Sequence, residues 1–126
     1  MQAVMVKVFD NAYLSNVTGY VDRANSHAVP VSAESVRING TLIQLAGTNT
    51  PKLELQLEGS YDGQVWTVAG LSSALIQLTS PPGVKQSSAL LAVDYAYVRL
   101  RATVSQTTGT DTKALFDAEL VFSHQA

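Results

Sequence analysis

The stretch PKLELQLEG, residues 51–59, alternates apolar and polar side chains from Lys52 to Glu58. Its leucines, Leu53, Leu55 and Leu57, fall on one side of an extended chain, and the polar side chains fall on the other. Because successive side chains of a β-strand point to opposite faces, this period of two predicts a strand with one buried face. The same period recurs in residues 96–105 and 113–123, where it predicts two further strands.

The residues that follow, SYDGQVWTVAG (60–70), indicate a turn and a second strand. Asp62-Gly63 favours a tight hairpin, because glycine adopts positive φ angles at little cost. We therefore predict a strand over residues 64–70 that carries Trp66, the chain's single Trp, into the core. Tyr61 and Asp62 are left at the tip of the hairpin as candidate contact residues.

Turn signals recur every eight to twelve residues or so along the chain, and no segment shows a sustained helical period. This pattern predicts an all-β fold, an antiparallel β-sandwich, jelly roll or barrel of about 8–10 strands without substantial helix. We expect a single domain over residues 1–126. Within it, we interpret residues 1–10 as an arm or edge strand, and residues 23–32 (RANSHAVPVS) as an extended loop that reaches away from the sandwich.

Composition narrows the functional classes. The 126 residues include no Cys, which excludes disulfides, thiolate metal sites and a cysteine nucleophile. The formal net charge is -2 and no basic stripe is present, so we expect no nucleic-acid partner. No apolar run approaches the roughly 18 residues that cross a membrane, and the N-terminus does not read as a signal peptide. Charged residues make up 14%, and this weakly charged polar surface suits packing against neighbours or an ordinary stable β domain.

The ionisable residues predict no catalytic or metal site. His27 falls in the expected loop and His124 falls near the C-terminus, and no metal-binding His spacing is present. Two carboxylate pairs lie on predicted strands, Glu54 with Glu58 and Asp117 with Glu119. We interpret both pairs as solvent-facing strand surface, and we expect Arg99 and Arg101 to pair with Asp117 and Glu119 across a hairpin. The sequence therefore predicts a protein without enzymatic activity or a cofactor.

The stretches LQLEGSYDGQVW, AYVRLRATVS and DAELVF, within residues 52–123, form a layout that resembles two groups of proteins. It resembles the discoidin-like jelly rolls of the galactose-binding type, in which a Ser-x-Asp-Gly turn precedes a buried Trp. A Tyr-Val-Arg-Leu strand follows in those domains, and a strand containing Glu closes the sandwich. The same layout looks like small β-sandwich structural proteins of tailed bacteriophages, including capsid decoration and other head or tail proteins.

The phage resemblance implies a non-enzymatic capsid decoration (cement) protein or other head or tail accessory protein. Such a protein would form a homo-oligomer, a trimer or ring, and would pack on the major capsid or tail protein in the virion after synthesis in the host cytoplasm. The discoidin-like resemblance implies the alternative, a carbohydrate-binding module used for adhesion. The absence of Cys and of a signal peptide favours the first. The candidate contact residues are Tyr13, Tyr20, His27, Tyr61 and Asp62.

Overall fold

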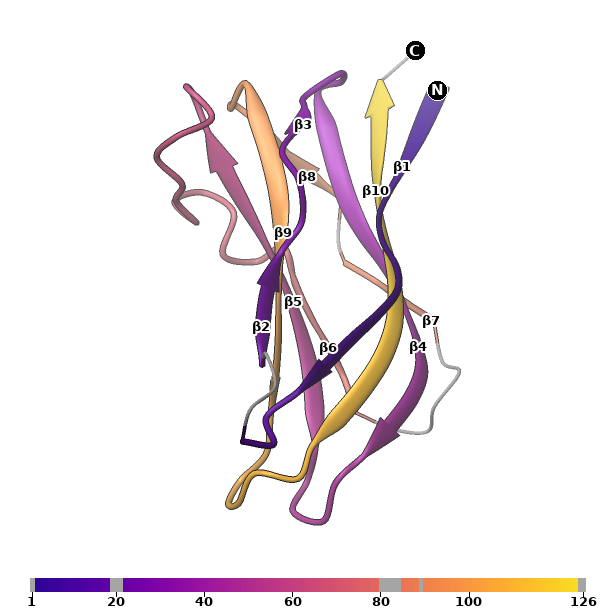
Figure 1. Ribbon diagram of the computed structural model, residues 1–126. Helices are drawn as coiled ribbons and strands as arrows, with labels where there is room; N and C mark the ends of the chain where they lie inside the picture. Colours follow the sequence, from indigo (N-terminus) through magenta and orange to yellow (C-terminus); the bar gives the residue numbers. More distant parts are fainter. Residues whose placement is uncertain (1, 19–21, 80–84, 89, 125–126) are drawn as a thin grey trace.

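The computed structural model describes residues 2–18, 22–79, 85–88 and 90–124 (Figure 1). Its strands are β1 (Gln2–Ser15), β2 (Arg23–Asn25), β3 (Val29–Pro30), β4 (Ser35–Ala46), β5 (Lys52–Ser60), β6 (Leu75–Leu78), β7 (Lys85–Ser87), β8 (Leu91–Ala92), β9 (Tyr97–Ser105) and β10 (Lys113–His124). The described residues contain no helix. The predicted all-β fold is therefore confirmed.

The strands form two antiparallel sheets packed face to face (Figure 1). Sheet A has the order β1-β10-β4-β7, with β8 also paired to β4, and sheet B has the order β2-β9-β5-β6, with β3 also paired to β9. The pairing is nested along the chain: β1 pairs with β10, β2 and β3 with β9, β4 with β7 and β8, and β5 with β6. This connectivity is that of a jelly roll.

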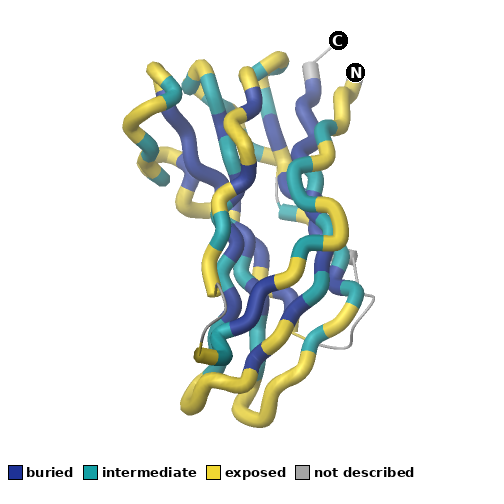
Figure 2. The backbone as a smooth tube through the Cα atoms, viewed as in Figure 1, coloured by how far each residue is buried: buried dark blue, intermediate teal, exposed yellow. Residues whose placement is uncertain are grey.

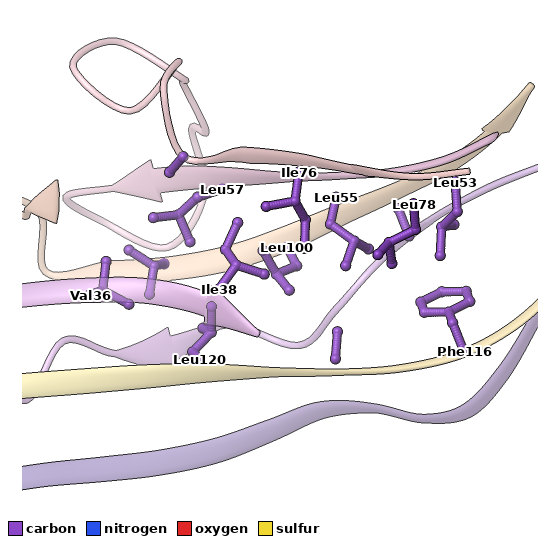
Figure 3. Close-up of a cluster of buried hydrophobic side chains, with 14 of the residues drawn as sticks. Val36, Ile38, Leu53, Leu55, Leu57, Ile76, Leu78, Leu100, Phe116 and Leu120 are labelled. Carbon is purple, nitrogen blue, oxygen red and sulfur yellow. The ribbon is translucent and has the colours of Figure 1, made fainter. Parts of the chain in front are cut away.

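The core lies between the sheets, where the strands present alternate side chains (Figures 2 and 3). Leu53, Leu55 and Leu57 of β5 are fully buried, as the alternation of residues 52–58 predicts. Residues 35–46 form the single strand β4, and Gly40 within it faces the core. A Cβ on Gly40 would lie 2.9 Å from Cδ1 of both Leu55 and Ile76, so glycine allows the two sheets to pack closely at this point.

Residues 23–32 differ from the extended loop that we expected. They contain β2 and β3, which both pair with β9 at one edge of sheet B. Between them, the Ser26 amide donates to the Leu100 carbonyl, and the Leu100 amide donates to the Ser26 hydroxyl at 2.9 Å. Val29 is buried in the core. One apolar anchor and satisfied backbone groups thus hold this segment against the sandwich.

The described part of residues 1–10 belongs to β1, the edge strand of sheet A. The register of β1 against β10 shifts after Lys7 and again after Phe9, and Asn11 follows with a φ of 49°. The Asn11 amide donates to Asp117 at 2.6 Å, and the Lys7 ammonium lies 3.3 Å from Asp10. Bulges and charges of this kind keep the middle of an edge strand from pairing with another chain.

Candidate contact surface

The loop after β5 begins with a turn that is built around one carboxylate. Oδ1 of Asp62 accepts hydrogen bonds from the amides of Val65 (3.0 Å) and Gln64 (2.8 Å) and from the Ser60 hydroxyl (3.0 Å). These hydrogen bonds, the one from the Val65 amide above all, hold the pKa of Asp62 below its ordinary value. Gly63 has a φ of 77°, the positive angle expected of the Asp-Gly pair. Asp62 therefore stays ionised and fixes the backbone of the turn.

The prediction of a strand over residues 64–70 with a buried Trp66 is wrong. A single β-bridge, Gly59 to Thr67, is the only pairing that this segment shows, and turns follow it. Trp66 is only partly buried, and the guanidinium of Arg99 lies 4.3 Å from the centre of its ring, a cation–π contact. Leu71, further along the loop, fills the core in its place.

Two tyrosines lie side by side beyond this turn. The rings of Tyr61 and Tyr95 are 4.8 Å apart, and the Tyr95 hydroxyl donates to the Ala69 carbonyl at 2.6 Å. The Tyr95 ring covers Gly59, because a Cβ on that glycine would lie only 2.4 Å from ring atom Cδ2. A hollow of about 240 Å³ is lined by Tyr61, Ala69, Gly70, Leu71, Ala92, Asp94 and Tyr95.

Exposed apolar side chains occur on several segments at one end of the sandwich. The described residues include seven large hydrophobic side chains that are exposed, and five of them belong to this end, namely Val4, Met5, Tyr61, Val65 and Leu90. The start of β1 lies on one side of this end, beside the C-terminal end of β10, and the loop after β5 lies on the other side (Figure 1, top). The loops 31–34, 61–74 and 90–96 add three carboxylates, Glu34, Asp62 and Asp94, and no Lys or Arg. We call this surface the apolar end.

The opposite end of the sandwich is a polar hydrogen-bond network. The Thr48 hydroxyl donates to Asp111 at 2.8 Å, and the side-chain amide of Asn49 donates to the Thr108 carbonyl at 2.9 Å. The bond from Thr48, followed by one from Gln106, lowers the pKa of Asp111. The two ends of the molecule therefore differ in chemistry, and we call this one the polar end.

The outer face of sheet B carries a buried ion pair. The Glu58 side chain is 8% exposed, and its carboxylate lies 2.9 Å from Nε of Arg99 and 3.5 Å from Nη1 of Arg101. The predicted pairing of these arginines with Asp117 and Glu119 is wrong, because β9 and β10 belong to different sheets. In the structure, Asp117 contacts Lys7 and the Asn11 amide, and Glu119 accepts a hydrogen bond from Asn39.

Beside this ion pair lies a hollow of about 410 Å³. It is lined by Arg23, Glu54, Gln56, Leu75, Arg101 and Thr103, and we call it the basic groove. The Glu54 carboxylate lies 3.5 Å from the Lys52 ammonium and accepts a hydrogen bond from the Gln77 side-chain amide at 3.2 Å. Arg23 is exposed, and Arg101 retains 39% exposure of its side chain despite its contact with Glu58. Two guanidinium groups are thus available to a partner on this face.

Of the four candidate contact residues that the structure describes, it brings together Tyr61 and Asp62, both at the apolar end. Tyr13 lies on β1 beside a shallow hollow that Gln44 and Leu115 also line, and His27 is exposed between β2 and β3. Tyr20 lies outside the described residues. Sequence reasoning missed Tyr95, Asp94 and Arg23, for which no local motif exists. Within the described ranges, no cluster of three metal-ligating side chains is present, and no helix long and apolar enough to cross a membrane.

Solved structures share this fold at low sequence identity. The PBSX exported protein XepA superposes with a TM-score of 0.66 at 17% identity, over 98% of this chain and 38% of that chain. The CBM36-1 domain of a multidomain xylanase, from the hindgut metagenome of Trinervitermes trinervoides, superposes with a TM-score of 0.56 at 5% identity. The match covers 99% of this chain and 100% of that chain. VP2 of the infectious bursal disease virus subviral particle superposes with a TM-score of 0.55 at 11% identity. The match covers 95% of this chain and 32% of that chain. No family model and no curated protein matches the sequence.

At these identities the likeness concerns the fold alone. The chain spans less than half the length of XepA and of VP2, and it matches the carbohydrate-binding module from end to end. The β-sandwich described above is therefore a framework shared by viral, exported and carbohydrate-binding proteins.

Proposed function

We propose that this chain is a non-enzymatic structural protein of a bacteriophage particle, a capsid decoration protein or another head or tail accessory protein. It self-associates and packs on neighbouring subunits of the virion. The observation that carries this proposal is the presence of five exposed large apolar side chains at the apolar end, opposite the polar end. The sandwich shared with VP2 of a viral particle supports it.

The exposure of these side chains is what an interface requires. Val65 is 72% exposed, Tyr61 68% and Met5 65%. Single exposed hydrophobic residues are ordinary on protein surfaces, whereas several of them at one end of a domain are consistent with a site of interaction. Tyrosine in particular is enriched at protein–protein interfaces. Burial against another subunit would remove this apolar surface from water.

The ion pairs and hydrogen bonds made by three carboxylates, Glu58, Asp62 and Asp111, support a structural role. A catalytic acid or base faces a concave site where substrate binds. Glu58 is enclosed by two arginines, and Asp62 and Asp111 accept hydrogen bonds that shape turns. Each of these groups serves the fold of the loop or sheet that carries it.

The role of the apolar end is tested by placing a charge on it. We expect light scattering after size-exclusion chromatography to show an oligomer for the wild type and a monomer for Val65→Lys, because a buried ammonium without a partner is costly. Thr108→Lys, at the exposed polar end, should leave the oligomer intact. Both variants should keep the wild-type stability within about 0.5 kcal/mol, as exposed substitutions do. A monomeric wild type at high concentration that binds neither capsid nor tail protein would contradict the proposal.

A second candidate function, carbohydrate binding, is favoured by the tyrosine hollow. Sugar rings pack on aromatic faces, and their hydroxyls bind planar polar groups beside them. Tyr61 offers an exposed ring, and Asp94 places a carboxylate in the same hollow. The sandwich shared with the CBM36-1 domain is consistent with such a role.

A glycan array separates the two candidates. Under the carbohydrate hypothesis, we expect saturable binding that Tyr61→Ala abolishes. Tyr13→Ala is the matched control, because Tyr13 is also an exposed tyrosine but lies on β1, outside the hollow. Equal loss in both variants, or no saturable binding by the wild type, would rule out the hollow as a sugar site.

A further inference from the structure

We propose that the apolar end of one copy docks into the basic groove of the next copy. This inference rests on the proposed self-association and names the two surfaces that meet. It follows from the distribution of charge and from the chemistry of the two surfaces. Each surface would repel a second copy of itself but is complementary to the other surface.

Charge is segregated between strands and loops. All eight Lys and Arg residues lie in strands, together with five of the ten Asp and Glu residues. The other five acidic residues lie in loops: Asp22, Glu34, Asp62, Asp94 and Asp111. The strands therefore hold a surplus of three positive charges, and the loops hold five negative charges with no Lys or Arg. The two values together give the net charge of -2.

The outer face of sheet B is the positive counterpart of the apolar end. Among the described strand residues, Lys52, Arg23, Arg99 and Arg101 lie on this face together with two acidic residues, Glu54 and Glu58. Glu58 neutralises much of the charge of Arg99, at 2.9 Å, and touches Arg101 less closely, at 3.5 Å. Arg23 and Arg101 thus remain to bind a carboxylate, for which a guanidinium has the matching fork of donors.

The apolar groups of the two surfaces also complement each other. Leu75 lines the basic groove and is 38% exposed. The apolar end presents Tyr61 and Val65, and a groove of about 410 Å³ is large enough to admit such a side chain. Asp94 lies in the same hollow as Tyr61, so its carboxylate would arrive at the groove with the tyrosine ring. Tyrosine and arginine are the residue types that dominate the centres of interfaces.

Electrostatics disfavours the other ways of pairing these surfaces. Two copies of the loops 31–34, 61–74 and 90–96 would bring carboxylates together, and two basic grooves would bring guanidinium groups together. The contact between one end and one groove joins opposite charges. Because it uses two different surfaces of the same chain, it is heterologous, and its repetition closes into a ring when the rotation per copy allows.

A charge exchange tests this contact. We expect Arg23→Glu and Asp94→Arg each to raise the dissociation constant of the oligomer about tenfold or more, and the double variant to restore assembly, because the exchanged charges again attract. Lys113→Glu, the same reversal at an exposed site on sheet A, should have little effect. Sedimentation equilibrium measures the constants, and rising salt should weaken the wild type and the double variant alike.

Each outcome decides the inference. The inference is supported if the oligomer dissociates in both single variants and forms again in the double variant. Thermal denaturation must show that every variant is folded. An oligomer that persists in Arg23→Glu and Asp94→Arg overturns the docking contact and leaves the proposed function standing. Failure of the double variant to reassemble overturns the pairing of these two surfaces. A monomeric wild type overturns the inference, and so does glycan binding at Tyr61 by a chain that stays monomeric.

Discussion

Gly59→Ala is expected to destabilise the protein by about 3 kcal/mol. Gly59 lies in β5 directly under the ring of Tyr95, and an added Cβ would lie 2.4 Å from Cδ2 and 2.5 Å from Cγ of that ring. The ring cannot yield as a flexible side-chain terminus could, because its hydroxyl is bound to the Ala69 carbonyl at 2.6 Å. Overpacking costs about 1–3 kcal/mol, and loss of the hydrogen bond adds about 1 kcal/mol.

A double-mutant cycle isolates the cause. In a Tyr95→Ala background the ring is gone, and Gly59→Ala should then cost less than about 1 kcal/mol, so the coupling energy is about 2 kcal/mol. Urea denaturation of the four proteins gives the free energies of unfolding. Equal costs of Gly59→Ala in the two backgrounds would show that the backbone of β5, and not the tyrosine ring, requires a glycine at this position.

Glu58→Gln is expected to cost about 2 kcal/mol. Glutamine keeps the shape of the side chain but removes the charge that Arg99 and Arg101 share. Removing one partner of a fully buried ion pair costs about 3–5 kcal/mol. Because the two arginine side chains remain 22% and 39% exposed, water compensates for part of the loss and reduces the expected value.

Glu54→Gln provides the matched control on the same strand and the same face. Glu54 lies 3.5 Å from Lys52, and both side chains are about one-third exposed. Exposed pairs contribute about 0–1 kcal/mol, so this substitution should change the stability by less than about 0.5 kcal/mol. Urea denaturation of both variants makes the comparison. Similar losses at the two positions would mean that burial of Glu58 adds nothing to the strength of its ion pair.

The sequence predicted the fold where alternation is uninterrupted. From Lys52 to Glu58, each residue predicted to face inward is buried, because a strand inside a sandwich has one apolar face throughout its length. The prediction failed for Trp66, where the alternation was continued past a turn. The loop after Ser60 leaves the sheet, so the period of two no longer decides which residue is buried there.

Pairing between strands was less predictable than the strands themselves. Arg99 and Asp117 lie on successive long strands, β9 and β10, which a simple hairpin would place side by side. The chain instead crosses between the sheets after Ser105, and Glu58 becomes the partner of Arg99. No local signal marks such a crossing, because it depends on which edge of which sheet is free.

The candidate site was predictable only in part, for the same reason. Tyr61 and Asp62 stand out because their turn has a recognisable sequence. Tyr95 and Asp94 come from a distant segment with no motif, and only the fold places them beside Tyr61. The basic groove joins Arg23 of β2 to Arg101 of β9, a neighbourhood that exists only once sheet B is assembled.

The nested pairing of the strands also determines the order in which the chain can fold. Of the ten strands, β1 leaves the ribosome before the others, yet its partner in sheet A is β10, the last of the ten. β5 and β6 are the innermost pair and the most local one, so we expect them to form early. Folds dominated by such distant pairings reach the native state in milliseconds to seconds or so. Until the twelve-residue strand β10 is synthesised, β1 therefore lacks the strand with which it pairs in sheet A.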